Sequence, residues 1–143
     1  MALDPNSEAA LKTIDIQQSV IARMAGASAS AKNWCVTVVS AVVVLAVDKK
    51  NPSFAAIAIV PATLFLVMDV YYLALERRVR ATHTAFAKQL REGVASTEAL
   101  FDVGPTRLSL ADTCAALQSK SIWPFYLLIG LSLLGVGLVQ AGK

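Results

Sequence analysis

Charged residues are scarce in this chain. Asp, Glu, Lys and Arg make up 16% of its 143 residues and hydrophobic residues make up 56%, whereas soluble domains carry about 25% charged and roughly 45–50% apolar residues. The charges are also unevenly placed, because three long apolar runs hold a single acidic residue, Asp69: residues 34–47, 54–75 and 123–139. This distribution argues against an ordinary soluble domain and predicts an integral membrane protein.

Residues that usually carry chemistry are few. His83 is the only histidine, and no Cys, His or carboxylate stands at metal-ligand spacing from it. No glycine-rich phosphate loop is present, and neither Cys35, Cys114 nor any serine has a plausible base as a sequence partner. We expect no disulfide, because Cys35 lies in an apolar run and Cys114 in a polar segment. The sequence therefore predicts a protein that is not an enzyme and has no cofactor.

The first 47 residues predict one long helix. Residues 1–12 lack the basic start, apolar run and cleavage site of a secretory signal peptide, so the first apolar run is expected to insert and remain. The helix can begin near Asp4, with Pro5 at an early position where its missing amide hydrogen has no cost. No breaker follows before Val47, and the small residues 25–31 are expected to pack closely against another helix.

The second and third spans follow from similar signals. A polar turn at residues 48–52 predicts an antiparallel hairpin of the first two spans. The second span carries Pro61, where a kink is tolerable if neighbouring helices satisfy the freed carbonyl, and its helix should continue to about Arg91 or Glu92 and end at Gly93. Further signals are a break at Gly104–Pro105, a capping box at 109–112 and a start of the third span at Trp123–Pro124.

These elements predict an all-α membrane protein with three transmembrane helices per protomer, a long N-terminal helix, a cytoplasmic helical extension and an oligomeric assembly. The expected division is a cytoplasmic amphipathic helix (1–33), a transmembrane hairpin (34–75), a basic cytoplasmic segment (76–122) and a third transmembrane helix (123–141). Most Lys and Arg residues lie on the side of the N-terminus and the central segment. The positive-inside rule therefore places the N-terminus in the cytoplasm of a bacterial inner-membrane protein.

Asp69 is a candidate functional residue, because carboxylates within membrane spans are rare. Lys32 lies 19 residues before Asn51 and Asp69 lies 18 after it, so an antiparallel hairpin places both at similar depth. The two residues are expected either to form an ion pair or to line a cation pathway and control its opening. The polar residues that could line such a pathway beside them are few: Thr37, Ser40 and Thr63.

A cationic stripe follows the second span. On a continuing helix, residues three or four apart lie on one face, and these are Arg77, Arg80, Thr84, Lys88 and Arg91, with Arg78 beside them. The opposite stripe is largely apolar, with Leu75, Val79, His83, Phe86 and Leu90. The cations could hold anionic lipid headgroups. Alternatively, stripes from several copies could converge on a polyanion such as an oligonucleotide.

Two segments carry a resemblance to a family. They are residues 16–25, followed by Lys32-Asn33-Trp34, and residues 69–73, Asp-Val-Tyr-Tyr-Leu, followed by Glu76-Arg77. This pattern resembles small membrane proteins that are encoded beside nucleotidyltransferases in bacterial antiphage defence islands. They include the SLATT group of two-helix effectors and the membrane effector of the Hailong system. The resemblance covers roughly residues 14–80.

The resemblance implies a homo-oligomeric ion channel, with a tetramer as the expected form. A nucleotide or single-stranded oligonucleotide made by a partner nucleotidyltransferase would bind on the cytoplasmic side and control opening, and an open channel would depolarise the inner membrane. In the Hailong system the ligand is an oligodeoxyadenylate that keeps the channel closed. The alternative is a membrane adaptor or sensor without a channel, whose basic stripe binds anionic lipid or a soluble partner.

Overall fold

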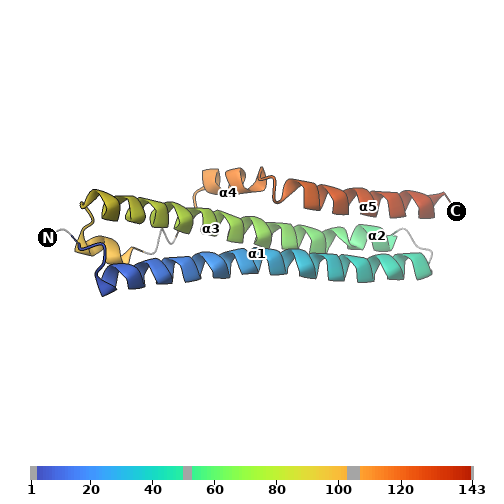
Figure 1. Ribbon diagram of the computed structural model, residues 1–143. Coiled ribbons are helices and arrows are strands. Elements are labelled where there is room, and N and C mark those ends of the chain that lie inside the picture. Colours follow the sequence, from blue (N-terminus) through green and yellow to red (C-terminus); the bar gives the residue numbers. More distant parts are fainter. Residues whose placement is uncertain (1–2, 50–52, 103–106, 143) are drawn as a thin grey trace.

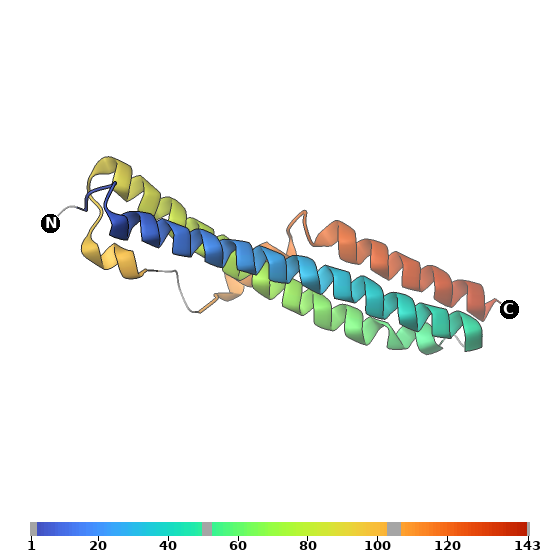
Figure 2. The same cartoon turned by 60° about the horizontal axis from the view of Figure 1, so that its bottom comes forward.

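The computed structural model describes residues 3–49, 53–102 and 107–142. All regular secondary structure in these residues is helical, which confirms the predicted all-α class: α1 (Glu8–Lys49), α2 (Ser53–Ile57), α3 (Ile59–Glu92), the 3₁₀-helix η1 (Thr97–Phe101), α4 (Leu110–Leu117) and α5 (Trp123–Ala141). The helices form an elongated bundle in which α1 and α3 run antiparallel along almost its whole length (Figure 1). Helix α5 lies beside the half of this pair that contains the end of α1 and the start of α3 (Figures 1 and 2).

Helix α1 begins at Glu8, later than the predicted start near Asp4. Asp4 accepts a hydrogen bond from the amide of Asn6 at 3.0 Å, and Ser7 Oγ accepts one from the amide of Ala10 at 3.3 Å. Ser7 therefore acts as the N-cap, because its side chain satisfies an amide that the first helical turn leaves free. Pro5 lies in the turn before the helix, so its predicted place in the first turn was wrong.

The second predicted helix is divided at Ala58, three residues before Pro61. Proline has no amide hydrogen to donate to the carbonyl of Ile57, the residue at which α2 ends. The helix is therefore interrupted at Ala58, where the sequence indicated only that a kink at Pro61 can be tolerated. The end of α3 is at Glu92 as predicted, and Gly93 terminates the helix with a left-handed φ of 69°.

The predicted capping box is present at α4, where Ser109 and Asp112 each accept a hydrogen bond from the other's backbone amide. Helix α5 begins at Trp123, with Pro124 in its first turn. The predicted break at Gly104–Pro105 and the predicted turn residues 50–52 lie outside the described residues.

Three helices are long and apolar enough to cross a membrane: α1, α3 and α5. The protomer buries only 22%, 17% and 6% of their respective apolar windows, so most of this surface needs lipid or another chain to cover it. Val44, Val60 and Leu128, for example, are 66%, 71% and 66% exposed. This exposed apolar surface is compatible with the multi-pass membrane localisation that the composition predicts.

Small clusters of buried residues join the helices. One joins the start of α1 to the end of α3 through Ala10, Phe86, Leu90 and Ala95. A second joins the spans through Cys35, Val39, Ala58 and Leu133. The third holds α4 and the start of α5 against α3 through Val70, Ala74, Ala116 and Ile122. The candidate site residues lie along this bundle in two groups. One group lies between the candidate spans, and the other lies on the part of α3 that follows Leu75, which we call the far half of α3.

Candidate functional site

The predicted contact between Lys32 and Asp69 is present. Lys32 Nζ of α1 lies 2.5 Å from Asp69 Oδ2 of α3, and the side chain of Asp69 is fully buried while that of Lys32 is 19% exposed. Ser28 completes the group, because its hydroxyl donates to Asp69 Oδ1 and accepts a hydrogen bond from Lys32 Nζ at 3.2 Å. A charge taken out of water is tolerated when it is both paired and hydrogen-bonded, and Asp69 is both.

The Asp69 carboxylate lies where the three spans meet. Cys35 of α1, which is fully buried, and Tyr126 of α5, whose hydroxyl oxygen is buried, are both within electrostatic range of it. The sequence analysis missed Ser28 and Tyr126. Ser28 stands one helical turn before Lys32 and could have been found from that spacing, whereas the position of Tyr126 depends on how α5 packs. The site therefore joins all three spans within one protomer.

The other three predicted pore residues do not join this group. Thr37, Ser40 and Thr63 are exposed on the outside of the protomer. The Thr37 hydroxyl donates to the carbonyl of Asn33 at 3.0 Å, and that of Thr63 donates to the carbonyl of Ile59 at 2.8 Å. Thr37 and Ser40 are three residues apart on α1 and lie on one face. A single protomer therefore does not bring the five predicted residues onto one pathway.

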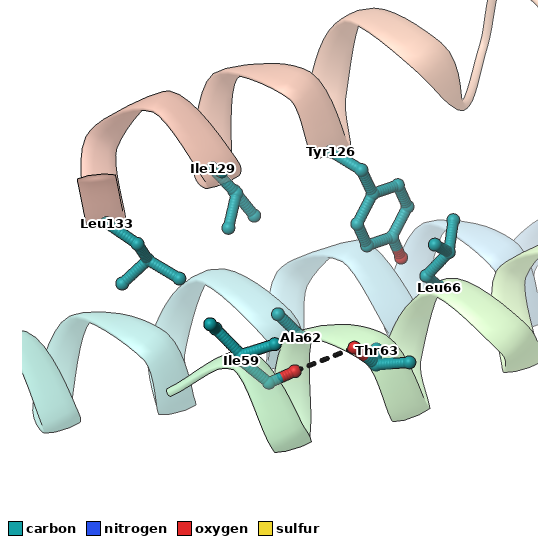
Figure 3. A pocket seen from close by; sticks show the side chains of 8 residues that line it. Ile59, Ala62, Thr63, Leu66, Tyr126, Ile129 and Leu133 are labelled. Atoms are coloured by element: carbon teal, nitrogen blue, oxygen red, sulfur yellow. Dashed lines mark hydrogen bonds between the residues drawn. The ribbon is translucent and has the colours of Figure 1, made fainter. Parts of the chain in front are cut away.

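Thr63 lines a shallow groove of about 170 Å³ between α3 and α5. The groove is largely apolar, with Ile59, Ala62, Leu66, Tyr126, Ile129, Gly130 and Leu133 as its other lining residues (Figure 3). The Thr63 hydroxyl bonds back to its own helix (Figure 3). This groove is suited to hydrocarbon.

Two of the predicted ligand-binding residues hold α4 against α3. The guanidinium of Arg77 donates to the carbonyl of Ala115 at 2.9 Å and to Ser119 Oγ at 2.8 Å. Arg78 donates to Asp112 Oδ2 from Nε at 2.9 Å and from Nη2 at 2.7 Å. The Arg77 contact places a cation at the negative end of α4, where exposed carbonyls favour it.

Asp112 is the acceptor at the centre of this contact. Hydrogen bonds from the Ser109 hydroxyl, from Arg78 and from the Ser109 amide lower the pKa of its carboxyl group from the ordinary 3.8 to about 2. Each of these donors stabilises the charged form, so Asp112 stays ionised over the whole neutral range.

The remaining cations of the stripe are on the surface. Arg80 Nε lies 2.6 Å from Glu76 Oε1, Lys88 Nζ lies 3.9 Å from Glu92 Oε1, and Arg91 is exposed. The side chains of Arg80 and Lys88 are 59% and 66% exposed. The Lys88–Glu92 pair is exposed on both sides and therefore weak, whereas Glu76 is only 12% exposed; the Arg80 guanidinium is still more than half exposed, so both cations stay accessible to an anion. The predicted stripe thus separates into two arginines that bind α4 and three cations that face outward.

A second polar group, which the sequence analysis missed, lies around the buried side chain of Gln17. Its Nε2 donates to the carbonyl of Asp102 at 3.0 Å, and its Oε1 lies 3.1 Å from Nδ1 of His83. The nearby Thr13 hydroxyl lies 3.4 Å from the carbonyl of Leu100. His83 therefore contacts α1 through Gln17, and no group of three potential metal ligands lies within residues 3–49, 53–102 and 107–142.

The fold and the site together define an all-helical protein with three candidate membrane spans, an ion pair between its helices and a separate basic surface on the far half of α3. No family model, curated protein or solved structure matches this chain. Its function is therefore argued from its own residues.

Proposed function

We propose that this protein is a homo-oligomeric ion channel whose opening is controlled by an anionic ligand on the cytoplasmic side. The ligand is a nucleotide or a single-stranded oligonucleotide, supplied by a partner nucleotidyltransferase. The channel acts as an effector of bacterial antiphage defence and depolarises the inner membrane when it opens. The N-terminus and the far half of α3 are cytoplasmic in this proposal, and a tetramer is the expected assembly.

The observation that carries the proposal is the continuity of α3. One helix runs from Ile59 in the membrane to Glu92 and carries the exposed Arg80, Lys88 and Arg91 along its far half. A multivalent anion bound to these cations would pull on the same rigid helix that carries Asp69. The proposed ligand site and the candidate span are thus parts of one helix, with no flexible linker between them.

Conduction requires several copies. Asp69 is fully buried and paired with Lys32, so it offers no open water path inside one protomer. Thr37 and Ser40 face outward from α1, where they can meet another copy. Polar groups in a membrane span usually face protein or water and not lipid. Assembly therefore supports a pathway at the interface between protomers.

The decisive measurement is conductance of the purified protein in planar bilayers, with and without a single-stranded oligodeoxyadenylate on the side of α3's far half. We expect a current whose open probability changes at least tenfold with the ligand. An oligomer that stays intact and passes no current in any nucleotide condition contradicts the channel. A current that is the same with and without nucleotides contradicts the proposed ligand but supports the proposed channel.

The second candidate function is a membrane adaptor or sensor without a channel. It is favoured by Arg77 and Arg78, because their contacts with α4 leave fewer free cations for a ligand. In this case Arg80, Lys88 and Arg91 would hold anionic headgroups, and vesicles with anionic lipid would compete with the oligonucleotide for the protein.

A further inference from the structure

One face of α1 stays uncovered along its whole length. Positions that alternate in steps of four and three residues form a continuous row on this face, and all are exposed: Gly26, Ser30, Asn33, Thr37, Ser40 and Val44. We call this row the α1 seam. The row of α1 that packs against the rest of the protomer lies elsewhere and includes Ser28, Ala31, Cys35 and Val39. The seam is therefore free to meet a partner.

The seam is unusually polar for a surface at membrane depth. The apolar run of α1 begins at Trp34, but a span of about 20 residues counted back from Asp48 begins near Ser28, so it extends beyond the predicted boundary at residue 34 and places Asn33 near one end of the span, with Thr37 and Ser40 deeper. The outward faces of α3 and α5 carry mainly large apolar residues such as Val60, Leu64, Val67, Leu131, Leu134 and Leu138. Lipid suits those faces better than it suits the α1 seam.

Hydroxyl groups in these helices can be satisfied within their own helix. Thr63 and Ser132 each donate their hydroxyl hydrogen to a carbonyl one turn earlier at 2.8 Å, and Thr37 of the seam does the same at 3.0 Å. The Asn33 carboxamide has two hydrogens to donate as well as an acceptor oxygen, so a single bond of this kind would leave it unsatisfied in hydrocarbon. Asn33 therefore calls for a polar group from outside the protomer.

Gly26 gives a further reason when it is taken together with Ser30. A side chain added at Gly26 would meet no atom within 4 Å, which is also true of Gly135 in α5, so the protomer itself requires glycine at neither position; Gly135, however, has Leu131 and Val139 four residues away on either side and no small residue there. Glycine inside a helix costs about 1 kcal/mol relative to alanine. Gly26 and Ser30 are four residues apart, which is the small-residue spacing that allows two helix backbones to approach closely. A helix from outside the protomer would explain both residues.

We propose that the α1 seam binds the α1 seam of a second copy of this chain. Copies in one membrane share their orientation, so equal residues meet at equal depth, and the Asn33 carboxamide can both donate to and accept from its counterpart. The alternating steps of three and four residues are those of a left-handed parallel helix pair, in which a single asparagine fixes the register. Arg23 occupies the next position before Gly26 and would face a like charge, so the packed part begins at Gly26.

This inference deepens the proposed function, because it rests on the assembly that a channel requires and names one of its contacts; a pair of seams joins two copies, so a tetramer uses a second face as well. Its test reads association alone and needs neither ligand nor current. A channel assembled through other faces would still conduct if the seam failed, and a seam could form in an adaptor that never conducts. Failure of the seam and failure of the channel are therefore distinguishable.

The first experiment is cysteine crosslinking in membranes, in the background Cys35→Ala and Cys114→Ser. Ser30→Cys, Asn33→Cys, Thr37→Cys and Ser40→Cys lie on the seam, and Val36→Cys and Leu45→Cys are exposed controls on its two sides. Mild oxidation should give at least tenfold more disulfide-linked dimer at seam positions than at the controls. Equal yields everywhere, higher yields at the controls, or no dimer at any position would overturn the seam.

The second experiment leaves both native cysteines in place. Gly26→Leu and its matched control Gly135→Leu each add a side chain where the protomer has open space. Energy transfer between labelled copies in liposomes should fall at least fivefold for Gly26→Leu and stay unchanged for Gly135→Leu, with both variants keeping wild-type helicity. Association that survives Gly26→Leu, or that falls equally for both variants, would contradict the proposal.

Discussion

Lys32 Nζ and Asp69 Oδ2 lie 2.5 Å apart, yet the two side chains differ in their access to solvent. Asp69 is fully buried, whereas Lys32 is 19% exposed and belongs to the residue type whose flexible stem can carry its charge toward the membrane surface. Removal of either partner therefore leaves a different defect. An unpaired Lys32 can move outward, but an unpaired Asp69 has only the hydroxyl of Ser28.

The first prediction follows from this asymmetry. Lys32→Met should destabilise the protein more than Asp69→Asn, by a difference on the order of 2 kcal/mol, because it leaves a carboxylate buried without a counter-charge. The double variant Lys32→Met/Asp69→Asn should recover most of the loss, since no buried charge remains. The measurement is the free energy of unfolding in mixed micelles. Equal losses of stability for the two single variants, or losses that add in the double variant, would show that an unpaired buried charge is not the cause of the destabilisation.

The attachment of α4 gives the second prediction. Asp112→Asn removes the charged acceptor that both the capping box and Arg78 use. The Ser109 cap and the Arg78 contact are both weakened, so the amides of α4 should exchange with deuterium faster than in the wild-type protein. Glu98→Gln, at an exposed acidic residue in the first turn of η1, is the control and should leave α4 unchanged. Unaltered exchange in Asp112→Asn would mean that apolar packing alone holds α4.

The third prediction concerns acid. The folded pKa of Asp112 is about 2 and its ordinary value is 3.8, so its ionised form stabilises the folded protein above pH 3.8. That contribution should be lost as the pH falls from 3.8 through about 2, because protonation removes the acceptor. A carboxyl-carbon NMR titration of Asp112 measures the midpoint directly. A midpoint at the ordinary value would show that the Ser109 and Arg78 hydrogen bonds are absent in solution.

Local signals along the chain predict much of this fold. The apolar runs predicted three helices of spanning length, Gly93 predicted the end of α3, and Ser109 with Asp112 predicted the capping box. Each of these features depends on residues within one or two helical turns. The Lys32–Asp69 contact could also be predicted, because a short turn fixes the register of an antiparallel hairpin.

Contacts between distant segments could not be predicted in the same way. The positions of Tyr126 beside Asp69 and of Gln17 beside His83 depend on how α5 and the η1 segment pack, and no local spacing encodes either. The charge stripe of α3 was predicted as one surface from helix periodicity alone. Its division arose because α4 returns to α3 and binds Arg77 and Arg78, which helix periodicity does not describe.

The three outward cations give the fourth prediction. Arg80→Gln, Lys88→Gln and Arg91→Gln together should weaken the binding of a single-stranded oligonucleotide at least tenfold and reduce its salt dependence. Each phosphate contact contributes about −0.7 to the slope of log K against log salt, so three lost contacts should change the slope by about 2. Lys49→Gln is the control, because Lys49 is the last residue of α1 and lies at the end of the bundle remote from these three cations. Unchanged affinity and slope would exclude this surface as the ligand site.

The fifth prediction assigns a proton on His83. Gln17 Nε2 lies 3.0 Å from the carbonyl of Asp102, which can only accept, so the amide nitrogen of Gln17 must face it and Oε1 must face the imidazole. Oε1 can only accept as well, and Nδ1 of His83, 3.1 Å away, must therefore carry a hydrogen. Neutral His83 should be the Nδ1–H tautomer, which is the minor form of free histidine in water, and ¹⁵N chemical shifts distinguish the two. Gln17→Glu keeps the acceptor toward the ring but loses the amide donor to Asp102, and it should retain the tautomer while the η1 segment loosens. An Nε2–H tautomer in the wild-type protein would show that Gln17 does not bridge α1, α3 and the η1 segment in this way.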